Sequence, residues 1–289
     1  PSTAGETAVQ GACKAVACGR RGVGDAGATD VPREPGSWRL WSDGSRMTSK
    51  RTLLGMLTPS SNTVLEPVTA AMLSGLPDVT AHFVRFRVME ISLSERALGQ
   101  FDFAPQLEAA RLLADARVHA ITWNGTSGSW LGFDQDRALC AAITRETGVP
   151  ATSSVLALAE IFGRTGVARY GLVSPYLDEV QEKIIANFRR EGFACVAERH
   201  LGRSDNFSFA DITPDTIETM AREVAKARPQ AITILCTNMN GASLAESLER
   251  ELGIPIYDSI ATALWGSLKA AGVDPARIEG WGSLFRNVR

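Results

Sequence analysis

Short apolar runs alternate with longer amphipathic stretches from Arg51 to the end of the chain. The apolar runs predict strands at 53–57, 80–86, 120–123, 170–173, 194–199, 231–235 and 254–257. Apolar residues at helical spacing predict helices over 63–73, 105–116, 134–147, 154–162, 176–191, 214–227, 244–252 and from 258 to about 271. Strands that alternate with helices are typical of parallel sheets covered on both faces, so an α/β fold is expected.

The order of strands and helices occurs twice, and short phrases repeat with it. His119-Ala-Ile-Thr-Trp-Asn-Gly matches Gln230-Ala-Ile-Thr-Ile-Leu-Cys, which begins 111 residues later and sets Gly125 opposite Cys236. Other matching phrases are Glu146-Thr-Gly-Val-Pro with Glu251-Leu-Gly-Ile-Pro, and Gly55-Met-Leu-Thr-Pro with Gly171-Leu-Val-Ser-Pro. The repeat predicts two pseudo-symmetric lobes, each a mostly parallel sheet flanked by helices, that face each other across a cleft.

The repeat also predicts the domain boundaries. We expect an N-terminal lobe over 47–163 and a C-terminal lobe over 164–271, with the tail 272–289 packing back on the first lobe. Residues 1–46 are rich in Gly, Ala, Arg and Pro and have no hydrophobic period. We therefore expect a disordered or non-native leader there, and a targeting peptide is disfavoured because acids interrupt the arginines.

Composition narrows the function classes. The chain has 289 residues, a formal net charge of -2 and no long basic run, which argues against nucleic acid as the main partner. No segment approaches the roughly 20 apolar residues that span a bilayer. The five cysteines and three histidines show no metal-type spacing. We expect a cytoplasmic protein with reduced thiols, no metal and no membrane partner.

Ligands of parallel α/β sheets bind beyond the carboxyl ends of the strands. The loops after Leu57, Trp123, Val173 and Leu235 are therefore expected to meet at the cleft. None of these loops matches GxGxxG or GxxxxGK[ST], so no motif supports nucleotide binding.

Cys236 is the candidate catalytic residue. It ends an apolar strand and precedes a polar loop that leads to a helix, where nearby amide groups are expected to lower the pKa of a thiol. The alternative is a buried core cysteine, the usual fate of a free thiol, and this alternative suits Cys140 and Cys195.

The loop after the matching strand offers groups that bind anions. Gly125, Thr126 and Ser127 combine exposed backbone amides with hydroxyls, which suits a carboxylate or an enediolate. The alternative is an ordinary turn between a strand and a helix. Trp123 and Trp130 flank this loop and form either an apolar pocket wall or part of the core.

Two further loops carry candidate ligands for a substrate. Ser60 and Asn62 lie in Pro-Ser-Ser-Asn-Thr, which also suits a helix N-terminus without a ligand. Tyr176 follows Ser-Pro and extends either into the cleft or onto the surface. Three arginines are alternative carboxylate partners, although solvated positions are the default: Arg85, Arg87 and Arg203.

From about residue 51 to residue 286 the chain resembles the aspartate/glutamate racemase superfamily, in particular its maleate isomerase and arylmalonate decarboxylase branch. The loop at Asn62 resembles the maleate isomerase loop whose asparagine contacts a substrate carboxylate. The loop at Tyr176 resembles the loop that supplies a substrate-binding tyrosine in both groups. Cys236 falls at the position of the second-lobe cysteine that both groups keep. Gly125-Thr-Ser is similar to the decarboxylase loop that holds a carboxylate, where maleate isomerases have a nucleophilic cysteine.

The resemblance implies an enzyme that needs no cofactor and acts at the α-carbon of a small carboxylate or dicarboxylate. Because Gly125 supplies neither a base nor a nucleophile, the resemblance favours decarboxylation, with Cys236 as the proton donor. The expected substrate-binding groups are Ser60, Asn62, Gly125, Thr126, Ser127, Tyr176 and the amide of Thr237. Maleate isomerase or racemase activity is the alternative, a carboxylate-binding protein without turnover is another, and assembly into a homo-oligomer is left open.

Overall fold

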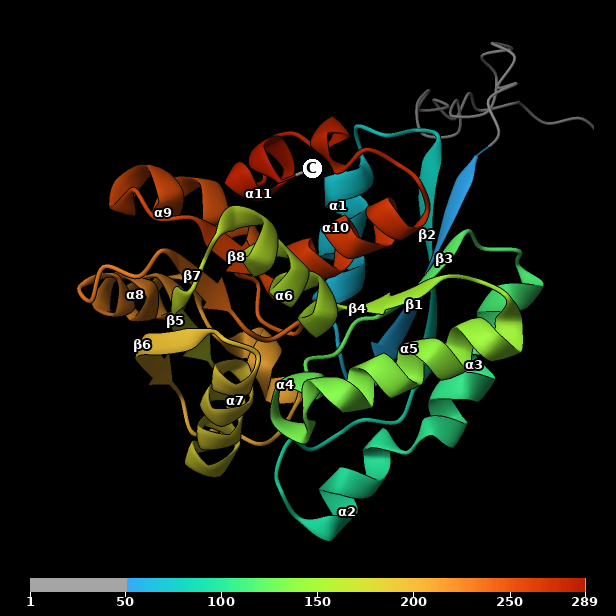
Figure 1. Ribbon diagram of the computed structural model, residues 1–289, viewed down its shortest axis with the longest axis horizontal. Coiled ribbons are helices and arrows are strands. Elements are labelled where there is room, and N and C mark those ends of the chain that lie inside the picture. The colour runs from blue at the N-terminus through green and yellow to red at the C-terminus, as the bar shows by residue number, and fades with distance from the viewer. Residues whose placement is uncertain (1–50, 289) are drawn as a thin grey trace, which may run out of the picture. The chain divides into compact units, whose positions relative to one another are not determined.

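Two four-stranded parallel sheets form the frame of the protein, whose computed structural model describes residues 51–288. The first sheet has the order β2-β1-β3-β4, with β1 at Thr52–Pro59, β2 at Val79–Phe86, β3 at Ala120–Trp123 and β4 at Ala151–Ser153. The second has the order β6-β5-β7-β8, with β5 at Arg169–Ser174, β6 at Ala194–His200, β7 at Ala231–Ile234 and β8 at Ile256–Asp258. The equal strand orders confirm the predicted α/β fold with two pseudo-symmetric lobes (Figure 1).

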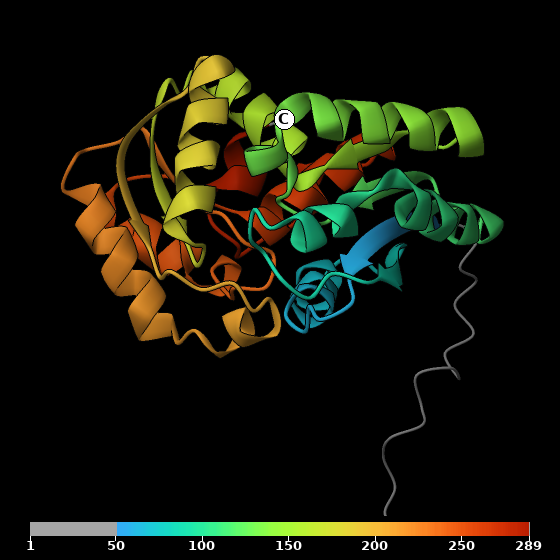
Figure 2. The same ribbon diagram turned by 90° about the horizontal axis from the view of Figure 1, so that it is seen from below.

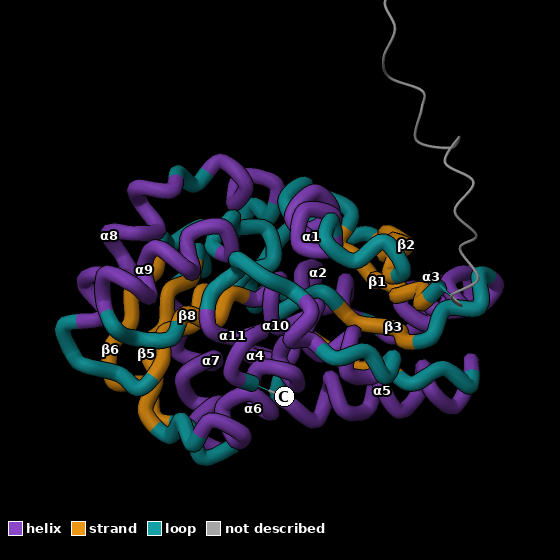
Figure 3. The backbone as a smooth tube through the Cα atoms, turned by 90° about the horizontal axis from the view of Figure 1, so that it is seen from above, coloured by secondary structure: helices purple, strands orange, loops and turns teal. Residues whose placement is uncertain are grey.

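Helices surround both groups of strands, as Figure 3 shows. As far as residue 165 they are α1 (Leu65–Leu73), α2 (Glu95–Leu98), α3 (Phe103–Asp115), α4 (Gly128–Leu131), α5 (Phe133–Thr147) and α6 (Ser154–Thr165). After it they are α7 (Asp178–Arg190), α8 (Pro214–Ala225), α9 (Ala245–Leu252), α10 (Ser259–Ala270) and α11 (Ser283–Asn287). The leader predicted at 1–46 lies outside the described residues.

The repeated phrases form the interior strands of the two sheets. β3 reads Ala-Ile-Thr-Trp and β7 reads Ala-Ile-Thr-Ile, and every position of both is buried. β3 pairs with β1 and β4, and β7 pairs with β5 and β8. β-branched residues suit strands that are covered on both faces. The loop that follows each of these strands therefore starts from the middle of a sheet edge.

Several predicted helix ends differ from the structure by one to three residues, and two of these differences have a clear local cause. Helix α6 continues through Gly163 and ends at Gly166, which has a φ of 68° and adopts the left-handed conformation that glycine favours. The helix predicted to begin at Tyr176 begins at Asp178 instead, because Leu177 is extended with φ of -68° and ψ of 155°. Tyr176 thus lies in the loop before α7.

Helices α6 and α10 join the two lobes. The ring of Phe162 in α6 packs against Tyr170 and Phe193 of the second lobe, with centroid distances of 5.5 and 5.2 Å. Helix α10 packs against α6 and against β3 and β4 of the first sheet, and Figure 1 shows both helices between the sheets. The division of the lobes at residue 163 stays a prediction, and α6 and α10 make contacts on both sides of it.

The tail after α10 contacts both lobes. Arg277 forms an ion pair with Asp78 at 2.6 Å in the first lobe. Ser283 donates its backbone N–H to Glu249 in the second, also at 2.6 Å. Within the described part of the chain, no helix combines the length and the apolar character that crossing a bilayer requires.

Candidate active site

A small cavity lies where the carboxyl ends of the strands meet. Residues at or just after the ends of β1, β3, β5 and β7 line it, which confirms the predicted meeting of these four loops. Its volume of about 20 Å³ is room for roughly one water molecule. The lining residues carry no ionised side chain at neutral pH: Pro59, Val88, Ile91, Phe101, Trp123, Gly125, Thr126, Ser127, Trp130, Tyr176, Asn206, Cys236 and Thr237.

The structure brings most of the candidate residues together at this cavity. The predicted residues on its wall are Gly125, Thr126, Ser127, Tyr176, Cys236 and Thr237. Ser60, Asn62 and the three candidate arginines do not line it. Sequence reasoning missed four wall residues, Val88, Ile91, Phe101 and Asn206, which lie on segments without periodic patterning. The tertiary fold alone places these four.

The thiol of Cys236 is buried and keeps its proton. Its side chain is 2% exposed, and its Sγ accepts a hydrogen bond from the backbone N–H of Asn238 at 3.4 Å. Burial raises the pKa of the Cys236 thiol to about 12, although hydrogen bonds from Tyr176 and the loop amides lower it in part. The expectation of a lowered pKa was therefore wrong, because loss of hydration outweighs the amide groups. A group of this kind is an acid at neutral pH.

A hydroxyl pair from the two lobes closes the site beside Cys236. Thr126 Oγ1 and the phenol of Tyr176 are 2.6 Å apart and both are buried. Burial raises the pKa of Tyr176 well above its usual value, so the phenol stays neutral and able to donate. Thr237 Oγ1 donates to the carbonyl of Asn124 across the lobes at 2.9 Å. The site thus offers neutral donors from both lobes.

Gly125 is crowded by an aromatic ring. A Cβ built at residue 125 would lie 2.0 Å from Cζ2 of Trp123. The carbonyl of Gly125 accepts a hydrogen bond from Ser154 Oγ at 2.6 Å, at the start of α6. Gly125 does not have a positive φ, so close approach rather than backbone conformation requires glycine here.

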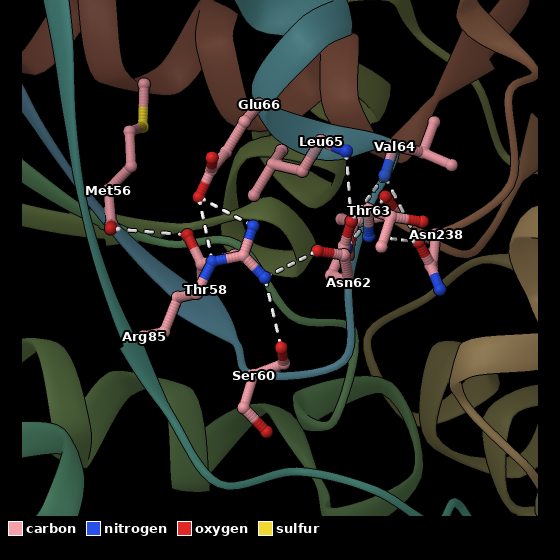
Figure 4. A network of polar contacts seen from close by, with 11 residues as sticks. Met56, Thr58, Ser60, Asn62, Thr63, Val64, Leu65, Glu66, Arg85 and Asn238 are labelled. Atoms are coloured by element: carbon pink, nitrogen blue, oxygen red, sulfur yellow. Dashed lines mark hydrogen bonds and ion pairs between the residues drawn. The ribbon is translucent and has the colours of Figure 1, made fainter.

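Asn62 and Ser60 belong to the support of the site (Figure 4). Asn62 Nδ2 donates to the carbonyl of Thr237 at 2.9 Å, while its Oδ1 accepts from the backbone N–H of Leu65 at 2.9 Å and caps α1. Arg85 Nη1 donates to the carbonyls of Ser60 and Asn62 at 3.0 and 2.7 Å. These contacts hold the loop against Thr237, and contact of either side chain with a substrate stays a prediction.

Residues 87–102, between β2 and α3, form a cross-lobe strap (Figure 2). Val88, Ile91 and Phe101 of this strap line the cavity. The backbone N–H of Ile91 donates to the carbonyl of Ser204 at 2.8 Å, and the backbone N–H of Asn206 donates to the carbonyl of Met89 at 3.0 Å. Asn206 Nδ2 also donates to Ser61 Oγ at 2.7 Å. The strap therefore joins the first lobe to the second and shares the cavity wall with Cys236.

The loops after β3 and β7 each have a buried carboxyl behind them. A Cβ built on Gly128 would lie 2.5 Å from Oδ2 of Asp136, and one on Gly241 would lie 2.8 Å from Oδ2 of Asp258. Neither Oδ2 atom has a hydrogen-bond partner. Burial raises the pKa of both carboxyls to about 7. Within residues 51–288, no three His, Cys, Asp or Glu side chains gather as metal ligands would.

Comparison with known proteins identifies relatives with two activities. The model of the arylmalonate decarboxylase family matches residues 55–285. Maleate isomerase of Nocardia farcinica is 26% identical over 240 residues, which cover 81% of this chain and 95% of the relative. Arylmalonate decarboxylase of Bordetella bronchiseptica is 27% identical over 182 residues, which cover 62% and 76%.

Solved structures agree with these matches. A variant of the Nocardia farcinica maleate cis-trans isomerase with a covalently bound succinylcysteine intermediate has a TM-score of 0.74 at 25% identity, covering 82% of this chain and 99% of that one. Unliganded arylmalonate decarboxylase has a TM-score of 0.68 at 23% identity, with 82% and 99% coverage, and shares the fold.

Proposed function

Because the chain belongs to the arylmalonate decarboxylase family, we propose that it removes CO2 from a substituted malonate without a cofactor and protonates the product with Cys236. The observation that carries this proposal is the presence of one thiol at the cavity, with Gly125 at the equivalent position of the other lobe. Two-base racemisation requires a proton donor and a base on opposite faces of the α-carbon. The first lobe provides neither at residue 125.

The cavity wall supports binding of an anion by neutral donors. The wall includes the hydroxyl-bearing residues Thr126, Ser127 and Tyr176, and we expect Thr237 to add its backbone amide. Such donors stabilise the charge of an enediolate best in a site that excludes water. The wall also includes the apolar side chains of Val88, Ile91, Phe101 and Trp130, and we expect the carboxylate that lies against them to be the one lost.

The proposed reaction has two steps. The bond between the α-carbon and one carboxylate breaks, CO2 leaves, and the bonding pair remains as an enediolate on the other carboxylate. The S–H bond of Cys236 then breaks and its proton goes to the α-carbon. The thiolate regains a proton from solvent. The raised pKa of Cys236 supports this role, since the thiol is protonated before each turnover.

Substrate entry requires a rearrangement of the cavity. A volume of about 20 Å³ admits no malonate. The strap contributes Val88, Ile91 and Phe101 to the wall and is held to the second lobe by two backbone hydrogen bonds. We therefore propose that the strap moves outward to admit the substrate and closes again before CO2 leaves.

The second candidate is cis-trans isomerisation of maleate. The relative that covers 81% of this chain is a maleate isomerase, and its homologous structure carries a cysteine joined to a succinyl group. The nucleophilic cysteine of maleate isomerases falls at Gly125, so in that reaction Cys236 would have to attack carbon in its place, as a thiolate. The raised pKa of the Cys236 thiol disfavours this ionised form, so decarboxylation remains the first proposal.

One experiment separates the candidates. The protein is incubated with a panel of malonates, maleate and amino acids in deuterated water, and the products are read by NMR. Loss of CO2 from a malonate supports the proposal, whereas alkene isomerisation of maleate or α-deuterium exchange of an amino acid contradicts it. If nothing turns over, thiol labelling with and without diacids is the second test. A reactive Cys236 that diacids protect favours an enzyme, and an inert Cys236 favours a binding protein.

A further inference from the structure

The two lobes differ at a second pair of equivalent positions. Trp123 and Ile234 hold the same place in the repeated phrase, two residues before Gly125 and Cys236. The Cδ1 atom of Ile234 packs at Gly241, where a built Cβ would lie 2.7 Å away. The indole of Trp123 instead packs on the next turn of its own loop, at Gly125. The space beside Cys236 and the space beside Gly125 are therefore filled differently.

Trp123 is held firmly in this position. Its side chain is fully buried, and its ring lies 5.0 Å from that of Phe86 by centroids. Its Nε1–H donates to Ser127 Oγ at 3.1 Å. Three of its ring atoms, Cζ2, Cε2 and Cη2, would lie 2.0 to 2.5 Å from a Cβ at residue 125. A real Cβ does not tolerate such distances, so no side chain fits at residue 125 while the indole stays in place.

We infer that Trp123 is a specificity-determining residue, whose indole occupies the place that a second thiol would need and leaves Cys236 as the one proton donor. This inference rests on the proposed decarboxylation. The face of the α-carbon opposite Cys236 then meets an apolar ring, so the proton arrives from one side and the product has one handedness. The Nε1 hydrogen bond gives the same residue a second task, because it orients the Ser127 hydroxyl at the anion-binding loop.

The inference corrects a simpler expectation from the repeat. Equivalence of residues 125 and 236 predicts that Gly125→Cys alone creates two facing thiols. With the indole in place, that change overfills the first lobe. Gly125→Cys combined with Trp123→Leu removes the obstacle. The introduced thiol then gives its proton to the opposite face of the enediolate and is left as a thiolate, which solvent reprotonates.

The packing part is tested without any substrate, by a double-mutant cycle on thermal stability. Gly125→Ala is expected to lower the Tm by roughly 3–10 °C, the range for overpacking in a domain of this size. In the Trp123→Leu background the same change is expected to cost far less. Trp265 is the matched control, because it is equally buried and also donates its indole N–H, to Val288 at 2.8 Å. Trp265→Leu should leave the cost of Gly125→Ala unchanged, and equal costs in all three backgrounds overturn the inference.

The specificity part is tested with α-methyl-α-phenylmalonate and chiral chromatography of the product. The parent and Trp123→Leu are expected to give one enantiomer in excess, and the double variant should lower the enantiomer ratio about tenfold or more. A double variant that folds, turns over and keeps the parent's ratio overturns the assignment of Trp123. A parent that decarboxylates no malonate overturns the proposed function, while the stability cycle still decides where the indole packs.

Discussion

The loops after β3 and β7 start from equivalent strands and supply different chemical groups. The loop after β7 places a buried thiol at the cavity, whereas β3 ends on the Trp123 indole and its loop places a glycine and two hydroxyls there. The first three residues of both strands are Ala-Ile-Thr, since burial on both faces favours small and β-branched residues. The positions just beyond the strands carry no such restriction, and under the proposed function one loop supplies the proton donor and the other the anion-binding groups.

Side chains that cross between the lobes keep the two loops in register. Thr237, next to Cys236, donates to Asn124, next to Gly125, and Thr126 meets Tyr176. Asn62 holds Thr237 from the first lobe as well. Because these bonds are buried, each is worth more to the geometry of the site than an exposed bond would be. The relative position of the two loops therefore depends on contacts that neither lobe makes alone.

The largest expected effect comes from removing the thiol. Cys236→Ser should lower kcat by roughly 10²–10⁴-fold, the usual loss for a general acid, because a hydroxyl gives up its proton far less readily. Binding of the substrate and the Tm should change little, since the two side chains are nearly equal in size. Steady-state rates with an arylmalonate and thermal denaturation measure the two effects.

Cys140→Ser is the control for this change, because Cys140 is buried in α5 and does not line the cavity. It should keep the parent's turnover. An inactive Cys140→Ser protein beside a fully active Cys236→Ser protein would show that the second loop does not donate the proton.

The next effect tests the anion-binding side. Tyr176→Phe removes the phenol that meets Thr126 and should lower kcat by roughly 10–10²-fold, the cost of losing a hydrogen bond to a charged group. Tyr170→Phe is the control, because Tyr170 is fully buried in the second lobe away from the cavity wall. A Tyr176→Phe protein with unchanged kcat and a raised KM would assign the phenol to substrate binding alone.

The sequence allowed the symmetric part of the molecule to be predicted. Strand β3 has the predicted bounds, and β7 ends one residue earlier than predicted. Both were predicted closely because a fully buried apolar run carries a clear signal. Strand β4 and helices α2, α4 and α11 were missed, since each has five residues or fewer and shows no period. The cysteine and the hydroxyl loop were found at the site because the repeat and the family resemblance both mark them.

The asymmetric part depended on tertiary packing and was not predicted. No local pattern shows that the Trp123 indole folds back on Gly125, or that the strap brings Phe101 to the cavity. The pKa of Cys236 was predicted in the wrong direction for the same reason, since burial in the folded protein outweighs the amides nearby in sequence.

The third prediction concerns how the second loop is held from the first lobe. Asn62→Ala removes the cap of α1 and leaves the carbonyl of Thr237 without its partner. The free energy of unfolding, measured with urea, should fall by about 2–4 kcal/mol, as for a lost cap together with a buried hydrogen bond. Unchanged stability with a raised KM would instead place Asn62 on the substrate.

The smallest expected effect is on the pH dependence of the free energy of unfolding, and it comes from the buried carboxyls behind the two loops. Asp136 and Asp258 have pKa values raised from 3.8 to about 7 by burial, so the folded protein holds their protons over a range in which the unfolded chain has lost them. Their contribution to stability is complete below about pH 4 and is lost as the pH rises through 7. The free energy of unfolding of the parent should therefore fall between pH 5 and pH 8.

Asn variants at these two positions should flatten that fall, each by on the order of 2 kcal/mol, because an amide does not ionise. All other titrating groups are shared with the parent, so the difference between the pH curves isolates the carboxyl. Asp258→Asn should keep the cap of α10, since Oδ1 of Asp258 accepts the backbone N–H groups of Ile260 and Ala261 and an Asn oxygen does the same. Asp136 caps no helix through its side chain, so Asp136→Asn is tolerated only if an amide fits behind Gly128. Parallel pH curves for parent and variants would show that both carboxyls are already ionised at pH 5, against the burial seen behind each loop.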